Sequence, residues 1–580
     1  MTIGVTIQVP PFWLNPARYV LNEMASVCGL SIDTENHYRS RSIGRLVYAR
    51  PGGSSSVLEE NHGNFRITIP YLGSETASRS EQGDWGARSC LWGDDQVPLH
   101  VRSPVIALPK GLPLARWANG GDPAIVLRGA GGKTVVEFSF DAISSYFLAI
   151  SQRDEDAIQE RDVHGRPLQE MTFPVVNDVT LSPMATDSAL LVGRAAREVC
   201  ERTRSFLLTK SPWPFGIQAV ACITHDVDSV RKWILSRVVN QMRGNAPPES
   251  RYAALPRLGK ILHTVAELTG FLDPHRNLRE VRAIETGRGV RATFFLQMAR
   301  RSSQRDPSAL YGYRDRYVRR EMEQASREGH ELALHSTYES ADHPGRLEEE
   351  VHRISDISPS SGARQHYLRI HRRVWREQEL LGLLYDSSVG YSEFVGFRSG
   401  ACHPYHPFDN QEERKLSILE IPFSVMDAAL YETCQGRREK MEGLLSRITQ
   451  TVAYRNGVFV SIWHNHYLDG ALVTEGSVLA WYLDLLKERG WHFWTMDRVA
   501  RWWNARNGAE LLYRDPETWE LVPGESMEQL TLRCDGGAPE RVDGLTDGAW
   551  SVVREGSSSF LILRGLRAAS PVTIHRGVAT

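Results

Sequence analysis

The sequence predicts a mixed α/β protein built around a parallel sheet or barrel, and three observations support this. Residues 219–224 form a short run of small, apolar and β-branched residues, the composition of a strand buried on both faces. From about 210 to 505, strand-like and helical patterns alternate along the chain, as in parallel sheets and barrels. Polar clusters follow several of the strand-like segments, where an α/β barrel carries its active site.

Length and composition set the broad class. At 580 residues the chain is too long for one ordinary core, and we expect three domains, at 1–210, 211–506 and 507–580. The chain is 41% apolar and 24% charged with a net charge of −2, so no basic field indicates binding to nucleic acid or an anionic membrane. The N-terminus does not resemble a signal peptide and no apolar stretch is long enough to span a bilayer, so we expect a cytoplasmic protein without a membrane span.

The cysteines indicate neither a disulfide framework nor a thiolate metal site. The seven are scattered along the chain, odd in number and never arranged as CxxC. We expect most of them to be buried thiols. Nothing in the sequence indicates an oligomeric state.

Residues 1–210 predict a mixed α/β domain. Apolar residues have helical spacing at 18–30, and strand-like alternation occurs at 45–50, 64–70 and 134–140. The stretch GAGGKT at 129–134 lacks the first glycine of a Walker loop, because Leu127 stands in its place. A Gly-rich turn between two strands explains this stretch better.

The second domain begins after Pro212-Trp213-Pro214 and alternates between helices and strands. In order after the first strand, we expect a helix at 230–242, an insertion at 244–260, a helix at 278–285, a strand at 291–297, a helix at 317–328, and strands at 329–335 and 458–464. A helix at 477–488, a strand at 491–495 and a helix at 496–503 complete this domain. From about 507, short alternating runs between Gly-rich turns predict a small β-sandwich with a packing role.

Asp226 and Asp228 directly follow the strand at 219–224. In an extended backbone, residues two apart point to the same side, so both carboxylates would face one site. Carboxylates at a buried strand end are costly to desolvate unless a metal, hydrogen bonds or a cation offset the cost. One of them can bind a metal and the other can accept a proton, whereas a solvated Asp-x-Asp turn is the plain alternative.

His335 is a second candidate ligand, at the end of the predicted strand 329–335. A zincin motif would need two histidines four residues apart on a helix. His330 and His335 are five apart in a strand-like segment, which excludes that motif and leaves His335 as the candidate.

Six short segments, taken in order, resemble the polysaccharide deacetylase family, whose NodB-homology domain is a distorted (β/α) barrel. They are THDVD (224–228), TFF (293–295), GHELALHSTYES (329–340), GARQHYL (362–368), YDSS (385–388) and SIWH (461–464), and they cover about half of the chain. Upstream, FDAISSYFLAISQRDED, DVHGRP and FPVVND resemble the α/β domain that precedes the deacetylase domain in one bacterial subgroup, often linked to surface-polysaccharide synthesis.

The resemblance implies a role for each matching residue. It makes Asp226 the catalytic base and Asp228 and His335 metal ligands. It also makes Arg364 the residue that orients the base, and His464 the catalytic acid.

The family has a further histidine four residues after the first one, and here that position is Glu339. The predicted ligands of a divalent ion, most simply zinc, are therefore Asp228, His335 and Glu339, with water or another side chain such as His343 as the alternative to Glu339. For substrate binding we expect Tyr367 and Trp463 to contact sugar faces and Arg398 to lie in a substrate loop at 396–407.

The predicted function is metal-dependent removal of N-acetyl groups from an amino sugar or oligosaccharide. Two alternatives stay open from the residues. Glu339 in place of a histidine is compatible with a catalytically silent relative that binds a glycan or a partner. Metal-assisted amide hydrolysis does not specify the acyl acceptor, so the substrate of an amidase could also be a small molecule other than a sugar.

Overall fold

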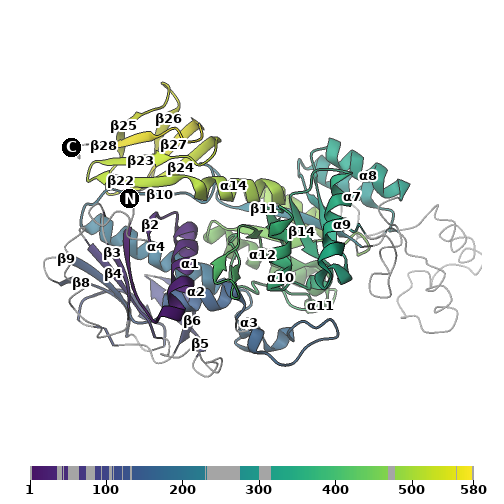
Figure 1. Ribbon diagram of the computed structural model, residues 1–580, viewed down its shortest axis with the longest axis horizontal. Coiled ribbons are helices and arrows are strands. Elements are labelled where there is room, and N and C mark those ends of the chain that lie inside the picture. The colour runs from purple at the N-terminus through teal and green to yellow at the C-terminus, as the bar shows by residue number, and fades with distance from the viewer. Residues whose placement is uncertain are drawn as a thin grey trace, which may run out of the picture.

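The structure is a computed structural model, which describes residues 3–34, 42, 45–49, 65–72, 85–92, 94–102, 107–108, 110–119, 122–130, 133–153, 155–228, 230, 275–298, 315–467, 477–556 and 558–577. The helix expected at 230–242 and the insertion at 244–260 lie outside the described residues. Figure 1 shows an N-terminal sheet with its helices on one side, a larger α/β unit beside it, and a C-terminal β unit above.

A mixed sheet dominates the N-terminal part, in the order β2-β1-β3-β4-β9-β8-β7-β5-β6. Its strands are β1 Ile3–Gln8, β2 Ile32–Asp33, β3 Arg45–Ala49, β4 Phe65–Pro70, β5 Trp85–Trp92, β6 Asp95–Arg102, β7 Leu112–Trp117, β8 Pro123–Ala130 and β9 Lys133–Phe138. The turn expected at 129–134 is confirmed, since β8 and β9 are antiparallel and Ala130 pairs with Lys133.

Helices α1 Pro11–Cys28, α2 Ala142–Ser151 and α4 Met184–Arg202 pack against one another and against this sheet. α1 begins earlier than its apolar spacing predicts, because a proline at the first helical position costs no hydrogen bond. It ends at Gly29, whose φ of 69° is left-handed. A Cβ there would lie 1.9 Å from the carbonyl oxygen of Lys210, so only glycine fits.

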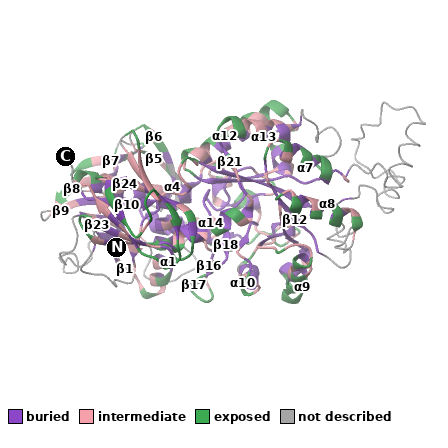
Figure 2. Cartoon of the chain, turned by 90° about the horizontal axis from the view of Figure 1, so that it is seen from above, coloured by how far each residue is buried: buried purple, intermediate pink, exposed green. Residues whose placement is uncertain are grey.

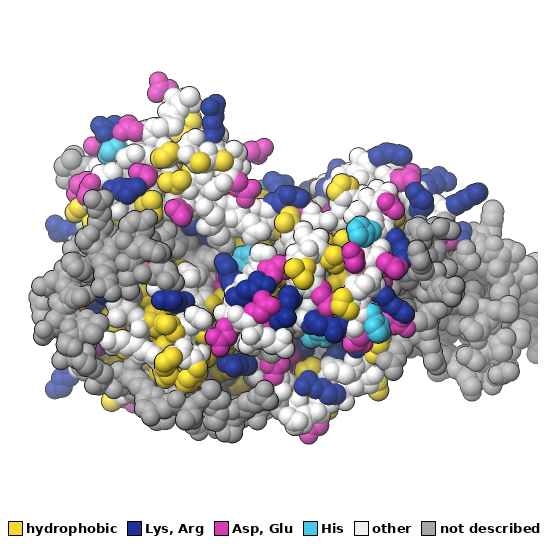
Figure 3. Space-filling model, viewed as in Figure 1, with side chains coloured by type: hydrophobic (Ala, Val, Ile, Leu, Met, Phe, Trp, Pro, Cys, Tyr) yellow, Lys and Arg dark blue, Asp and Glu magenta, His cyan; other side chains and the backbone are white. Residues whose placement is uncertain are grey.

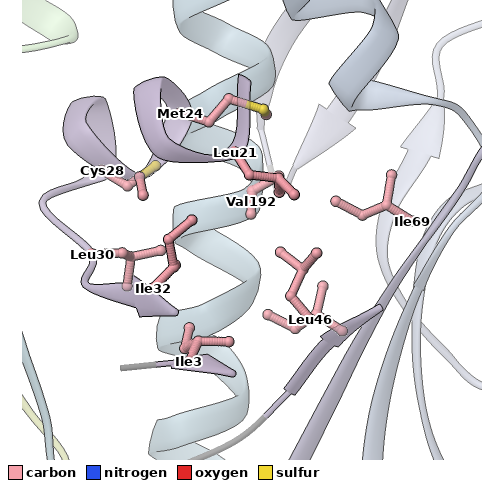
Figure 4. A pocket seen from close by; sticks show the side chains of 11 residues that line it. Ile3, Leu21, Met24, Cys28, Leu30, Ile32, Leu46, Ile69 and Val192 are labelled. Carbon is pink, nitrogen blue, oxygen red and sulfur yellow. The ribbon is translucent and has the colours of Figure 1, made fainter. Parts of the chain in front are cut away.

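A small cavity lies between α1, α4 and the sheet, and Figure 4 shows hydrophobic side chains around it. Leu21 and Met24 of α1 face Ile69, Leu46 and Val192 across the space. The one polar group among the lining side chains, the thiol of Cys28, already donates to the carbonyl oxygen of Ala189 at 2.8 Å, so this cavity is a packing feature of the core.

A parallel sheet forms the central unit, in the order β18-β15-β14-β13-β12-β11-β20-β19, with β21 paired to β11. Its strands are β11 Val220–Val227, β12 Thr293–Leu296, β13 Glu331–Ser336, β14 Gly362–Gln365, β15 Tyr385–Asp386, β18 Leu419–Glu420, β19 Val425–Met426, β20 Val458–Ile462 and β21 His492–Phe493. The two edge strands, β18 and β19, are separated by only residues 421–424. So short a connection forces the sheet to curl until its edges approach, as in a distorted barrel.

Helices cover the outside of this curled sheet. They are α7 Leu278–Gly287, α8 Arg316–Arg327, α9 Pro344–Ser355, α10 Arg372–Leu380, α11 Asp427–Thr433, α12 Arg438–Tyr454 and α13 Val478–Glu488. A further helix, α14 Met496–Gly508, packs instead against Val220, Phe295 and Tyr385 on the other face of the strands. A short hairpin of β16 Phe408–Asp409 and β17 Arg414–Lys415 stands apart from the sheet. Figure 2 shows buried strands inside and exposed outer faces on the helices, which explains why the strands have continuous apolar sequences and the helices amphipathic ones.

The segment between the N-terminal helices contacts the central unit. It contains η3 Glu155–Ala157, η4 Gln169–Met171 and α3 Phe173–Val176. Gly396 of the central unit has a φ of 138°, and a Cβ there would lie 2.1 Å from the carbonyl oxygen of Thr180. The two backbones therefore approach closely at this point.

The C-terminal part consists of two antiparallel sheets, β10-β24-β27-β26 and β22-β23-β28-β25. Their strands are β10 Leu207–Lys210, β22 Glu510–Asp515, β23 Thr518–Val522, β24 Met527–Asp535, β25 Pro539–Asp543, β26 Trp550–Glu555, β27 Ser558–Leu566 and β28 Val572–Arg576. β10 comes from the end of the segment expected to form the N-terminal domain and pairs with β24. The hydrophobic core of the N-terminal sheet also continues into this part without a break.

Within the described residues, no helix combines the length and apolar composition needed to cross a bilayer. Figure 3 shows positive and negative side chains interspersed over one face of the molecule. This distribution agrees with the small net charge of the sequence.

Candidate metal centre and catalytic residues

The predicted site residues lie at the carboxyl ends of neighbouring parallel strands. Asp226 and Asp228 stand at the end of β11, His335 near the end of β13, and Arg364 in β14. His335 and Arg364 are partners in the register between β13 and β14. The parallel order gathers side chains that are up to about 240 residues apart in the chain, because all of these strands end on the same side of the sheet.

Three side chains converge closely enough to hold a metal ion: Asp228, His335 and His366. One ligand atom from each lies within 4.8 Å of the others, and no other such group occurs among the residues that the structure describes. Oδ1 of Asp228 is 3.1 Å from Nε2 of His335 and 3.7 Å from Nε2 of His366. Ligand atoms about 2.1 Å from a tetrahedral ion are about 3.4 Å apart, so this Asp-His-His group fits zinc or a similar ion.

The tautomer of His335 suits a ligand. Its Nδ1 is 3.0 Å from the backbone carbonyl oxygen of Arg364, to which it donates, so the neutral ring carries its lone pair on Nε2, the nitrogen that faces Asp228. Burial lowers the pKa of His335, but the carboxylates of Asp226 and Asp228 outweigh it and raise the pKa above its ordinary value. For Asp228 burial has the opposite effect and acts to raise the pKa of the carboxyl, but the surrounding histidines outweigh burial, and the pKa of Asp228 lies below its ordinary value.

Glu339 does not belong to this group, contrary to the sequence prediction. The chain leaves β13 at Ser336 and turns into η7 Tyr338–Ala341, which points Glu339 towards Arg346 of α9. The two side chains form an ion pair near the surface. Its predicted place is occupied by His366, which lies just after β14 in η8 His366–Leu368.

His366 was not among the residues predicted from the sequence, although its spacing could have indicated it. Arg364 and His366 are one residue apart at a strand end, as are Asp226 and Asp228. Polar residues at positions i and i+2 of a strand end share one face of the sheet. His343, the other side chain considered in place of Glu339, is exposed just before α9 and is not in the group.

Asp226 is buried beside the Asp-His-His group and is held by Arg364. Nη1 of Arg364 donates to Oδ1 of Asp226 at 2.6 Å and to Oγ1 of Thr224 at 2.9 Å. Its Nε donates to the carbonyl oxygen of Ser387 at 2.8 Å, and the guanidinium lies 4.1 Å from the centre of the Phe295 ring. Burial acts to raise the pKa of Asp226, but Arg364 and two nearby histidines lower it below its ordinary value.

His464 borders the group on another side, just after β20. Its Nε2 is 3.7 Å from Oδ2 of Asp228. Nδ1 lies 2.7 Å from Oδ1 of Asp427, and the backbone N–H of His464 donates to Oδ2 of the same carboxylate at 2.6 Å. Burial lowers the pKa of His464, but Asp427 and the aspartates of β11 raise it to about 10. Asp427, the first residue of α11, was not predicted from the sequence.

Tyr367 follows His366 directly and is half-buried. The centre of its ring lies 4.3 Å from that of His366. The structure therefore places this predicted substrate residue next to the Asp-His-His group.

Arg398 and Trp463, the other two residues predicted to bind substrate, are buried and bonded inside the protein. Arg398 is buried and forms a two-bond ion pair with Glu155 at 2.9 and 2.6 Å, so it joins two parts of the chain. Trp463 is 3% exposed and packs in the hydrophobic core, where its indole N–H donates to Oγ of Ser461 at 3.0 Å. The guanidinium of Arg398 and the indole N–H of Trp463, which we expected near a sugar, are thus bonded to Glu155 and Ser461.

No protein-family model and no curated protein matches the chain. Among solved structures, it is similar to Agd3, a carbohydrate deacetylase, at 9% identity over 100% of this chain and 99% of that one, with a TM-score of 0.42. It is also similar to a protein designated a probable polysaccharide deacetylase from Pseudomonas aeruginosa PAO1, at 16% identity over 50% of this chain and 93% of that one, with a TM-score of 0.35.

A branching enzyme of type GH57 from the archaeon Pyrococcus horikoshii is also similar, at 9% identity over 49% of this chain and 70% of that one, with a TM-score of 0.29. All three TM-scores are below 0.5, so the residues of the site, rather than these likenesses, have to support a function. Deacetylases of polysaccharides, the class that the motif order resembles, are thus among the solved structures similar to this chain.

Proposed function

We propose that the chain is a metal-dependent hydrolase that removes N-acetyl groups from amino sugars of a glycan, on a barrel of the NodB-homology type. The observation that carries this proposal is the arrangement of Asp226 and His464 beside the Asp-His-His group. Amide hydrolysis needs a polarised carbonyl group, a base for the attacking water and an acid for the leaving amine. The site offers one candidate for each task.

Asp228, His335 and His366 would hold the ion, for which zinc is our first choice because one carboxylate and two imidazoles are typical zinc ligands. When bound, a divalent ion supplies a Lewis acid for the amide carbonyl and lowers the pKa of a water molecule towards neutrality.

Asp226 is the proposed general base. Its lowered pKa keeps it ionised at neutral pH, and Arg364 fixes the carboxylate through Oδ1. The other oxygen, Oδ2, lies 3.8 Å from Nε2 of His335 and faces the Asp-His-His group. In the proposed reaction, water attacks the carbonyl carbon and gives its proton to this carboxylate.

His464 is the proposed general acid. Its raised pKa keeps it protonated at neutral pH, and Asp427 fixes the ring through Nδ1. Nε2 is then the atom that donates a proton to the amine nitrogen as the carbon–nitrogen bond breaks. The products are acetate and a free amino group on the sugar.

Glu339 no longer motivates the alternative of a silent binding protein, because His366 completes a ligand set without it. A surface-polysaccharide pathway is our proposal for the setting, based on the resemblance of the upstream segments in the sequence.

The test is acetate release with zinc-loaded protein from N-acetylhexosamine monomers and oligomers and from N-acetylated amines that are not sugars. We expect release from the sugars only, and a loss of about 10²–10⁴-fold in kcat for Asp226→Asn with zinc still bound. Asp484→Asn is the matched control, because Asp484 pairs with Arg288 on the surface. No acetate from any sugar would refute the proposal, and release only from the other amines would establish the amidase alternative.

A further inference from the structure

The turn formed by residues 162–166 lies far from the barrel in sequence but contacts the residue next to a proposed ligand. The carboxylate of Asp162 closes this turn by accepting hydrogen bonds from the backbone N–H groups of His164 and Arg166, at 2.8 and 2.9 Å. Its other oxygen accepts from Nε of Arg166 at 2.6 Å. The guanidinium of Arg166 is thus held in a fixed direction.

Arg166 uses this direction to bind the turn that carries His366. Its Nη1 donates to the backbone carbonyl oxygen of Tyr367 at 2.7 Å, a contact that spans 201 residues of the chain. In return, Nε of Arg369 donates to the carbonyl oxygen of His164 at 3.1 Å. The two turns are therefore joined by a pair of arginine-to-carbonyl hydrogen bonds.

Aromatic rings fill the space between these turns. The ring centres of His164 and Tyr367 are 4.3 Å apart, and Tyr338 lies 5.7 Å from His164 and 5.5 Å from Tyr367. Tyr367 in turn lies against His366. The imidazole of His366 thus packs against a ring that the 162–166 turn holds from the other side.

The backbone after His366 needs such support. Tyr367 and Leu368 both have left-handed conformations, with φ of 57° and 55°. Two consecutive residues other than glycine in this region are unfavourable and persist only where surrounding contacts enforce them. The bond from Arg166 acts on the carbonyl between these two residues.

We propose that Arg166 is a positioning residue of the metal centre, which holds the left-handed turn so that His366 faces Asp228 and His335. This inference rests on the proposed metal-dependent function. It assigns a role in the active site to a segment that comes before the barrel in sequence. Groups that orient ligands typically change metal affinity by about 10–100-fold.

The test is zinc affinity of the full-length protein, stripped of metal and titrated in competition with a fluorescent chelator. We expect Arg166→Gln to bind zinc about 10–100-fold more weakly than wild type, and Arg166→Lys to recover part of the loss. Arg288→Gln is the control. The side chain of Arg288 is 14% exposed and that of Arg166 is 10% exposed. Like Arg166, Arg288 donates hydrogen bonds to a carboxylate and to a backbone carbonyl oxygen. It lies at the end of α7, and its variant should bind zinc as wild type does.

The outcomes separate this inference from the proposed function. If wild type binds no zinc, the metal-dependent function fails. A second outcome refutes the inference alone. In this outcome wild type binds zinc, His366→Ala does not bind zinc, and Arg166→Gln binds zinc as tightly as the control variant does. Should Arg166→Gln not fold by circular dichroism, Asp162→Asn replaces it, because this change loosens the guanidinium while keeping it. Weakened zinc binding in that variant supports the inference, and wild-type binding refutes it.

Discussion

Arg364 serves two groups of the site with different parts of one residue. Its guanidinium fixes Asp226, while its backbone carbonyl fixes the tautomer of His335. Both functions follow from the position of β14 in the sheet. It pairs with β13, which carries His335, and its inward-facing Arg364 side chain reaches Asp226 at the end of β11. A substitution of the side chain should therefore affect the base without changing the hydrogen bond that orients the ligand.

The first prediction concerns the third ligand. His366→Ala should lower zinc affinity by more than about 100-fold, because it removes a ligand rather than a group that orients one. Glu339→Ala should leave zinc affinity unchanged, since Glu339 pairs with Arg346 instead. Zinc content by elemental analysis after dialysis distinguishes the two. Loss of zinc in Glu339→Ala with retention in His366→Ala would restore the ligand set predicted from the sequence.

Sequence reasoning located those site residues that depend on local pattern alone. Asp226, Asp228 and His335 stand at the ends of strands that the sequence predicted, whereas Arg364 was predicted only from the resemblance of GARQHYL to a family motif. Glu339 was misplaced because a 3-10 helix, not visible as a periodic pattern, turns its side chain away. His366 shares the i, i+2 spacing with Arg364, but the left-handed turn that places it is bonded to a segment 201 residues away, and the local sequence does not show that bond.

Among the elements of the barrel, β15 and β18 carry a buried pair of acids, Asp386 and Glu420. Gln378 of α10 donates to Asp386 at 2.7 Å, and Trp375 of the same helix donates to Glu420 at 3.0 Å. Burial raises the pKa of both carboxyls, and the nearby charge of Asp386 raises the pKa of Glu420 further. The folded protein therefore retains a proton here that the unfolded chain releases.

The second prediction is a pH dependence of stability from this pair. Because the folded pKa values exceed the unfolded ones, the contribution is fully present below about pH 4 and is lost as pH rises towards the folded pKa. A folded pKa that lies one pH unit above the unfolded pKa corresponds to about 1.4 kcal/mol of stability. Asp386→Asn removes one acid and can still bond Gln378 if that amide flips. We therefore expect its melting temperature to fall less than that of wild type as the pH rises from about 4 to about 9.

The control for this prediction is Asp484→Asn, which removes a half-exposed carboxylate on α13. Its melting temperature should follow the wild-type pH profile. A parallel profile for Asp386→Asn as well would show that the buried pair is not the source of the dependence.

Elements with a strong period were predicted well, and short ones were not. The helices expected at 278–285, 317–328 and 477–488 and the strands at 291–297 and 458–464 are confirmed within a few residues. Two-residue strands such as β15, β18 and β19 have too little sequence to show a period. β10 was missed as part of the C-terminal sheet because its partner, β24, lies more than 300 residues later in the chain.

At the scale of the whole molecule, buried ion pairs attach the upstream segment to the barrel. Arg398 bonds Glu155, and Arg455 bonds both carboxylate oxygens of Asp187 at 2.6 and 2.8 Å. The 162–166 turn lies between Glu155 and Asp187 in the chain, so these pairs hold both ends of the segment that contacts the site. Attachment of the upstream segment and positioning of His366 are thus parts of one arrangement.

The third prediction tests this attachment. Glu155→Gln should lower the stability of the full chain by about 3–5 kcal/mol, because it leaves the buried guanidinium of Arg398 without its counter-charge. Glu160→Gln, an exposed change five residues on, should stay within about 0.5 kcal/mol of wild type. The denaturation midpoint in urea, followed by tryptophan fluorescence, measures both.

The double variant Glu155→Gln with Arg398→Met decides whether the pair itself is responsible. Removing the second charge eliminates the uncompensated guanidinium, so the double variant should be less destabilised than the sum of the two single variants. Because the attachment orients the 162–166 turn, Glu155→Gln should also weaken zinc binding, and Glu160→Gln should not. Additive losses in stability, together with wild-type zinc affinity in Glu155→Gln, would show that the barrel holds its metal centre independently of the segment that precedes it.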